Sequence, residues 1–149
     1  MSQTVTPHNM NDLFSLPGVK SISYIPASSL ADKLGVQALA GLPIYIHATP
    51  TPIEFNGDPT CECTHSNAGM SPSQSLEFSF RSTQQIPDDR YLAFLVVDVN
   101  GHSYLIGTKE EHPLIERVQS FGNPDSDPST FTYTIQLTSP RALIPCSIL

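Results

Sequence analysis

The segment Cys-Glu-Cys-Thr-His gathers two thiols and one imidazole within a short stretch of chain. Cys61, Cys63 and His65 occupy alternate positions, so in an extended strand their side chains point to one face. Zinc accepts both ligand types, but alternate side chains of a flat strand stand about 6.6 Å apart, which is awkward for two thiolates on one tetrahedral ion. Cys146 and His47 could complete a site only through folding, and no second pair with zinc-finger spacing follows. We therefore expect reduced, partly buried cysteines without a metal, a cofactor or a disulfide.

A serine, a histidine and an aspartate also lie close together, at Ser103, His102 and Asp98. These are the residue types of a hydrolase triad, but here they surround a predicted hairpin loop. The sequence contains no Gly-x-Ser-x-Gly elbow that would present the serine beside an oxyanion hole. We expect no catalytic residues and no enzyme activity.

The paired carboxylates give equally little chemistry. Asp88-Asp89 and Glu110-Glu111 are adjacent pairs in predicted turns, where carboxylates usually face water. Asp125 and Asp127 form a single Asp-x-Asp, without the glycine and the downstream glutamate of a calcium-binding loop. A small metal-dependent enzyme that uses Cys61, Cys63 and His65 is kept only as a third hypothesis.

Length and charge limit the classes of function. A chain of 149 residues is of ordinary size for one domain. It has 7 basic and 14 acidic residues, a net charge of −7 and no basic cluster, so we expect no sequence-specific nucleic-acid binding. The longest uncharged stretch, Leu34 to Ile53, is interrupted by glycines and prolines, so we expect no membrane span. The first residues lack a basic and an apolar region, which predicts folding in a reducing cytoplasm.

The surface composition hints at assembly. Charged residues make up 14% of the chain, against about 25% in an ordinary soluble domain, while serine and threonine are abundant. A free monomer usually relies on charge for solubility. A low-charge, hydroxyl-rich surface therefore suggests cover by neighbouring subunits.

Periodicity predicts strands through most of the chain. Leu76, Phe78 and Phe80 alternate with polar residues, as do Phe131 and the apolar positions that follow it. Spacing of four from Leu30 onward predicts a short helix or two turns within residues 28–40. The predicted strands span residues 19–26, 43–48, 60–66, 73–82, 91–99, 102–107, 114–121, 130–138 and 142–149.

Asn100-Gly101 between two apolar runs predicts a β-hairpin with a two-residue type I′ turn. That turn places Val97 opposite Tyr104, Leu95 opposite Ile106 and Val96 opposite Leu105. Both faces of the hairpin are then apolar, so a second sheet must cover one face and the helix or another subunit the other. The predicted oligomer-interface residues are Leu92, Phe94, Val96, Leu105, Ile144, Ile148 and Leu149.

One resemblance adds to this prediction. A strand at Val19–Ile25, an alternating strand at Ser73–Ser82, and a final strand at Phe131–Leu137 frame the segment Phe94–Glu111. In that segment Asp-Val-Asn-Gly ends a strand, Tyr-Leu-Ile-Gly returns, and Lys-Glu-Glu forms a turn. This arrangement, over about residues 70 to 140, resembles small virion structural proteins of tailed bacteriophages. The resemblance implies a β-sandwich or barrel subunit that joins a ring or tube in a tail, neck or baseplate, and it carries no catalytic residues.

We therefore expect one all-β domain over residues 1–149, a mainly antiparallel β-sandwich or partly open barrel with one short helix. Residues 1–17 are expected to form a flexible or partner-bound arm. The predicted function is that of a non-enzymatic structural subunit in a homo-oligomer, located in a virion and in contact with other virion proteins. A monomeric ligand- or carbohydrate-binding β-module is the alternative.

Overall fold

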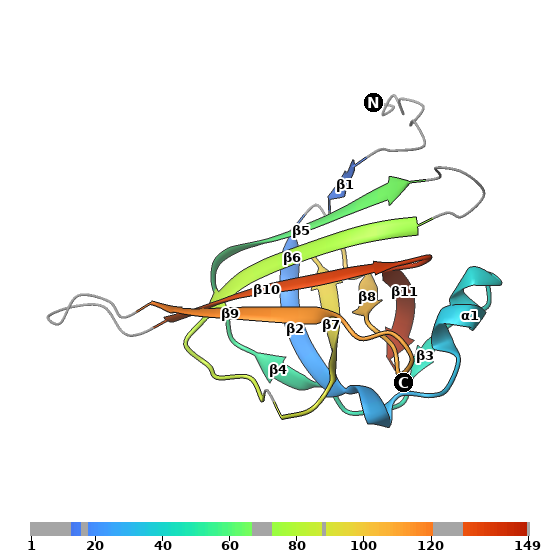
Figure 1. Ribbon diagram of the computed structural model, residues 1–149, viewed down its shortest axis with the longest axis horizontal. Coiled ribbons are helices and arrows are strands. Elements are labelled where there is room, and N and C mark those ends of the chain that lie inside the picture. The colour runs from blue at the N-terminus through green and yellow to red at the C-terminus, as the bar shows by residue number, and fades with distance from the viewer. Residues whose placement is uncertain (1–12, 16–17, 67–72, 88, 121–129, 149) are drawn as a thin grey trace, which may run out of the picture.

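The computed structural model describes residues 13–15, 18–66, 73–87, 89–120 and 130–148. Its strands form two packed sheets (Figure 1). The five-stranded sheet contains, in spatial order, β1 (Leu13–Ser15), β5 (Asn56–Ser66), β6 (Ser73–Ser82), β10 (Thr130–Ser139) and β9 (Leu114–Ser120). The six-stranded sheet contains β3 (Tyr45–Ile46), β11 (Leu143–Ile148), β8 (Ser103–Ile106), β7 (Leu92–Asp98), β2 (Val19–Pro26) and β4 (Thr51–Ile53). All pairs are antiparallel except β3 with β11, so the predicted all-β architecture is confirmed.

The main core lies between the two sheets. On β6 and β10 the alternation seen in the sequence turns every second side chain inward, which buries Phe78 and Ile135 completely. Tyr133 is buried among them, and its hydroxyl donates to the Gln84 carbonyl and accepts from the Ile86 N–H, both at 3.0 Å. Full burial of each large apolar side chain contributes about 1.5–3 kcal/mol. This core fixes which face of the five-stranded sheet is turned outward.

A second apolar cluster covers the other face of the six-stranded sheet. The segment between β2 and β3 forms a 3₁₀ turn, η1 (Ala27–Ser29), and the helix α1 (Leu34–Leu39). Its buried Leu30, Leu34 and Ala38 belong to the same cluster as Leu105 and Ile144 of the sheet. The predicted short helix is therefore confirmed, and it covers this face without a second subunit.

Two polar contacts attach the α1 segment to the turn after β8. The Glu110 carboxylate accepts a hydrogen bond from the Lys33 N–H at 3.2 Å, and Lys109 forms an ion pair with Asp32 at 2.9 Å. The Lys109 ammonium holds the pKa of Asp32 below its usual value. Lys33 itself has a positive φ of 62°, which turns the chain into the helix without a side-chain cap.

The hairpin of β7 and β8 forms as predicted, but its register differs by one residue. Val96 pairs with Tyr104 and Leu95 with Leu105, because the loop holds three residues between Asp98 and His102 rather than two. Gly101 alone takes the left-handed conformation in this loop, with φ of 87°, as in a type I turn followed by a bulge. The Asp98 carboxylate favours this loop by accepting the N–H groups of Asn100 and His102, both at 2.9 Å.

The ends of the chain correct and refine two further predictions. Within the predicted arm 1–17, Leu13–Ser15 pair with β5, so the arm preceding the fold is shorter than expected, and residues 1–12 lie outside the described part. The predicted C-terminal strand is confirmed as β11, which lies between β3 and β8. Pro145 pairs with Tyr104 on the β8 side, whereas β3 pairs only with Ser147 and Ile148, so the proline occupies an edge position as predicted.

Candidate functional site

β9 is the outermost strand of the five-stranded sheet (Figure 1). Every residue from Leu114 to Gln119 is exposed. Three of them are large and apolar: Leu114 is 73% exposed, Ile115 37% and Val118 55%. The strand has 7 residues and no proline. A long edge strand with exposed apolar side chains is a template for pairing with another chain.

The other edges of the two sheets are protected. β4 has 3 residues and includes Pro52, and β3 has only 2 residues. At the far edge of the five-stranded sheet, β1 covers Glu62–Thr64 of β5, and Pro59 together with a bulge between Asn56 and Thr60 interrupts the rest. Short strands, prolines, bulges and charged side chains are devices by which proteins prevent edge pairing. Among the described edges, β9 alone is neither short nor interrupted by a proline or a bulge, although it carries Glu116 and Arg117.

A second exposed apolar surface lies on the other sheet. Val36 and Leu39 on α1, with Leu42 and Tyr45 after it, are between 48% and 64% exposed. We call these four residues the α1 patch. In Figure 1 the helix lies at one end of the molecule, next to β3. The α1 patch and β9 are therefore separate surfaces on different sheets.

Five of the seven predicted interface residues are on neither surface. Leu92, Phe94, Val96, Leu105 and Ile144 are each at most 1% exposed within this single chain, so they cannot contact a neighbour in the folded protein. The prediction was wrong because the opposite sheet covers one face of the hairpin and the α1 segment covers the other. Of the remaining two residues, the side chain of Ile148 and the whole of Leu149 lie outside the described part.

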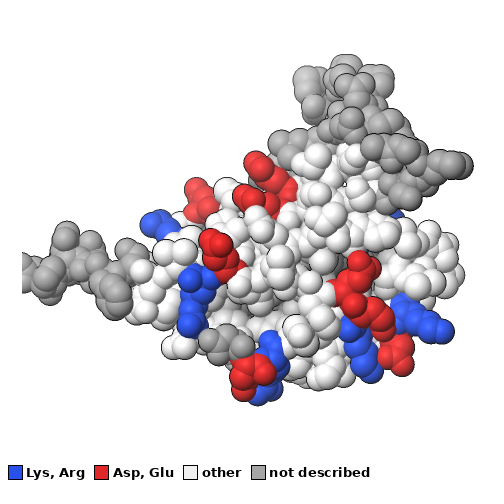
Figure 2. Space-filling model, viewed as in Figure 1, with Lys and Arg blue, Asp and Glu red and all other residues white. Residues whose placement is uncertain are grey.

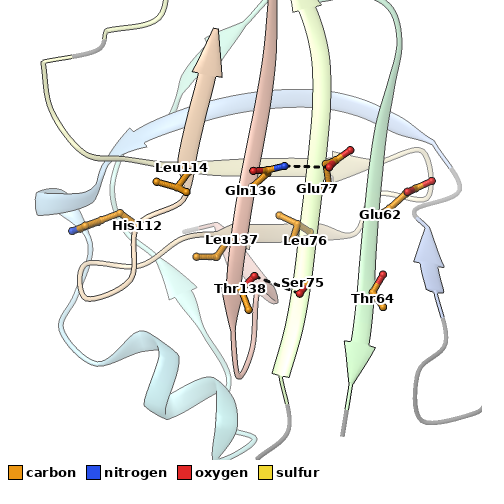
Figure 3. Close-up of a pocket in the computed structure, with 10 residues that line it drawn as sticks. All are labelled: Glu62, Thr64, Ser75, Leu76, Glu77, His112, Leu114, Gln136, Leu137 and Thr138. Atoms are coloured by element: carbon orange, nitrogen blue, oxygen red, sulfur yellow. Dashed lines mark hydrogen bonds between the residues drawn. The ribbon is translucent and has the colours of Figure 1, made fainter. Parts of the chain in front are cut away.

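A hollow of about 670 Å³ lies over the outer face of the five-stranded sheet, and Figure 3 shows its lining. Glu62, Glu77 and Gln136 form one row across β5, β6 and β10. The Gln136 amide donates to Glu77 Oε2 at 3.2 Å. In the next row the hydroxyl oxygens of Ser75 and Thr138 lie 3.4 Å apart. The hollow thus offers carboxylate, amide and hydroxyl groups at fixed spacing, as expected for a polar binding surface.

His112 lies at one end of this hollow. Its ring stacks on Tyr91, with centroids 4.1 Å apart, and its Nδ1 is buried without a hydrogen-bond partner. Sequence reasoning had not selected His112, Glu62 or Glu77, because a cross-strand row is visible only once the strand register is known. Figure 2 shows acidic and basic side chains interspersed on this face of the molecule.

Among the predicted cysteine and histidine ligands, Cys63 and His65 line one small pocket. Cys61 and Cys63 point to the same face, as predicted, but that face is the main core. Burial raises the pKa of Cys61 to about 12 and also raises the pKa of Cys63. Metals bind the thiolate, so a raised pKa weakens both thiols as ligands. Cys146 packs on the cluster under α1, and no group of at least three metal-binding side chains is assembled within the described residues.

Asp98 and His102 are close, but the remainder of the triad is missing. His102 Nδ1 lies 3.5 Å from Asp98 Oδ2. Burial alone would raise the pKa of Asp98, but N–H donors of His102 and Asn100 and the nearby imidazole outweigh it, so that pKa lies below its usual value. No hydrogen bond joins Ser103 to His102 among the described contacts. The dyad therefore stabilises the loop and has no activated nucleophile.

The acidic pairs also serve local structure where they are described. Asp89 binds its neighbour Arg90 at 3.2 Å, and Glu110 holds the Lys33 N–H. Asp88, and with it half of the first pair, lies outside the described residues, as do Asp125 and Asp127.

Three comparisons with known proteins complete this description. No protein-family model, no curated protein and no solved structure matches the chain. No described helix has the length and apolar character needed to cross a membrane. The described features that bear on function are the two exposed apolar surfaces and the polar hollow.

Proposed function

We propose that this chain is a non-enzymatic structural subunit of a homo-oligomeric ring or tube. The observation that carries the proposal is the presence of two different exposed apolar surfaces, β9 and the α1 patch, on different sheets. A two-fold dimer needs one self-complementary surface, whereas head-to-tail association needs two unlike surfaces and generates rings or filaments. The low charged fraction of 14% is consistent with a surface that assembly covers.

The virion is the setting that the sequence resemblance implies. The segment that carries the resemblance forms the β7–β8 hairpin and the turn containing Lys109 and Glu110, and that turn anchors the α1 segment. We propose a place in the tail, neck or baseplate of a phage particle, with other virion proteins as neighbours. With a net charge of −7, a lumen lined by this chain would repel DNA, and a basic lumen in the assembled particle would refute that part.

The test introduces a lysine on each of the two surfaces, at positions whose side chains are equally exposed. Val118 and Leu39 are 55% and 54% exposed, so lysine at either site should leave the monomer fold intact, with a change in stability within about 0.5 kcal/mol. Native mass spectrometry at micromolar concentration should show an oligomer for the natural chain. Val118→Lys and Leu39→Lys should each give monomers.

Mixing the two variants makes the test specific for head-to-tail contact. Each variant retains one intact surface, so an equal mixture should form a heterodimer and nothing larger. A natural chain that remains monomeric would refute the proposal. So would an oligomer that only Val118→Lys disrupts and that mixing does not restore, because that is the behaviour of a two-fold dimer.

A monomeric binding module remains the second candidate, because the polar hollow favours it. Carboxylates and hydroxyls such as Glu77, Ser75 and Thr138 are groups that bind sugar hydroxyls. A monomer that binds a glycan, and loses that binding on Glu77→Gln but not on Glu116→Gln, would favour this function over assembly.

A further inference from the structure

We propose that the N-terminal segment of a neighbouring copy, residues 2–6, adds as a strand to the free edge of β9. This inference rests on the proposed function, since it names the segment that fills one of the two association surfaces. Strand addition uses backbone hydrogen bonds for affinity and alternate side chains for specificity. Three observations favour this occupant. The edge is long and carries apolar side chains, the charges on β9 disfavour pairing with its own copy, and the segment lies shortly before β1 in the sequence.

The edge has room for a strand of this length. β9 spans Leu114–Ser120 and is last in its sheet. Leu114 and Val118 lie on the outer face, since they pair with the outward-facing Gln136 and Thr132 of β10, while Ile115 pairs with the buried Ile135. Both faces of the edge therefore carry an apolar side chain, which an added strand could cover on both sides.

Pairing of β9 with its own copy is opposed by charge. In an antiparallel pair the opposed residues lie on the same face of the sheet. The register with full overlap therefore places Arg117 opposite the same residue of the second copy. The register that pairs Leu114 with Val118 places Glu116 opposite Glu116. Like charges directly opposite each other are destabilising, which opposes these two registers. The register with Val118 opposite Val118 opposes no like charges but leaves Leu114 and Ile115 unpaired. A different, uncharged strand therefore fits the full length of this edge better.

The segment Ser2–Thr6 has the required chemistry. Its sequence is Ser-Gln-Thr-Val-Thr, which contains no charge and no proline and ends at Pro7. Thr4, Val5 and Thr6 are β-branched and favour strands. Val5 is the single large apolar side chain among them, and it could cover Val118 or Ile115.

The segment precedes β1 in the sequence, and β1 forms the edge of the five-stranded sheet opposite to β9. Four strand spacings separate the two edges, about 19 Å. Residues 7–12, which link the segment to β1, reach about 20 Å when extended. In a head-to-tail array the segment of one copy therefore reaches the β9 edge of the next. The α1 patch of the first copy remains available to contact the apolar side chains of that β9.

Truncation tests this inference separately from the proposed function. A chain lacking residues 2–10 keeps all described strands, so its thermal unfolding should match that of the monomeric Val118→Lys variant, which association does not stabilise. If the inference holds, the full chain is oligomeric and the truncated chain is monomeric by native mass spectrometry. A synthetic peptide of residues 2–12 should then bind the truncated chain one to one, and Val118→Lys should weaken that binding at least tenfold. A truncated chain that stays oligomeric overturns the inference and leaves the proposed function standing, whereas a monomeric full chain overturns both.

Crosslinking checks that the contact joins two copies. In a Cys146→Ser background, one chain carries Val5→Cys and a separately purified chain carries Val118→Cys. A mixed disulfide between them is expected on mild oxidation, and Leu39→Cys in place of Val118→Cys serves as the control. Equal crosslinking to both positions would contradict a contact at β9.

Discussion

Glu62 on β5 lies directly opposite Glu77 on β6, so two carboxylates form one cross-strand pair. The only hydrogen bond described for either side chain comes from the neutral amide of Gln136, and no described lysine or arginine forms an ion pair with them. Like charges in such a position destabilise a sheet. This pair on the exposed face of the sheet therefore lowers the free energy of unfolding.

Glu62→Gln should therefore stabilise the protein. Removing one of two opposed charges is expected to raise the free energy of unfolding by about 0.2–1 kcal/mol, measured by urea denaturation at neutral pH and low salt. The gain should shrink in about 1 M salt, where the Debye length is about 3 Å. Glu116→Gln is the control, since Glu116 pairs with the neutral Thr134. Equal gains from both variants would point to net charge rather than to this pair.

Tyr133→Phe should destabilise the main core although it removes a single oxygen. The hydroxyl satisfies the Ile86 N–H and the Gln84 carbonyl in a buried setting, and the variant leaves both without that partner. A loss of about 1–3 kcal/mol in the free energy of unfolding is expected. Tyr91→Phe, on a ring that is 69% exposed, should change stability by less than about 0.5 kcal/mol. Similar losses in the two variants would contradict the role of the buried hydroxyl.

Asp98→Asn should alter how stability depends on pH. The pKa of Asp98 is lower in the folded chain than its usual value of 3.8, so the unfolded chain takes up the proton first as the pH falls. The contribution of the carboxylate is therefore complete above about pH 4 to 5 and is lost as the pH falls through the lowered folded pKa. The difference in Tm between the natural chain and Asp98→Asn should be largest near neutral pH and should shrink toward pH 3. Parallel curves for the natural chain and Asp98→Asn would refute this linkage.

The cysteines should react slowly while the chain is folded. Burial raises the pKa of Cys61 to about 12 and that of Cys146 to about 11, and the thiolate is the reactive form. At pH 8 an increase of two units in pKa lowers the thiolate fraction about a hundredfold. An aromatic disulfide reagent should label Cys146 first, because it is only half buried, and should label all three at once in denaturant. Rapid labelling of Cys61 in the folded chain would contradict its place in the core.

The strands that alternate clearly could be predicted from the sequence, because one buried face imposes a period of two. β6 and β10 are examples, and their predicted and observed spans nearly coincide. β1 and β4 were not predicted, because three-residue strands owe their form to the strand beside them and not to their own pattern. The hairpin register was missed for a different reason: Asn-Gly suits both a two-residue and a three-residue loop, and the Asp98 carboxylate decides between them.

The exposed apolar surfaces could not be found by looking for the most apolar stretches of sequence. The strands of the β7–β8 hairpin are the most apolar part of the chain, but the rest of the chain buries them. Their burial depends on Leu30 and Leu34, which belong to the same cluster as Leu105 and Ile144, far along the sequence. Leu114, Ile115 and Val118 become notable only once the structure shows that β9 is an edge strand and that the other edge strands are short or interrupted. The sequence pattern of residues 114–121 had indicated a strand, but not its place in the sheet.

The insertion of β11 between β3 and β8 means that the six-stranded sheet is closed by segments far apart in the sequence. Within the described part β3 pairs with β11 alone, and Ile44 and Ile46 belong to the same buried cluster as Ile144. Such non-local pairing forms slowly, because the intervening chain must first be ordered. A chain cut before residue 143 would leave the layer beneath α1 open to chaperones and proteases.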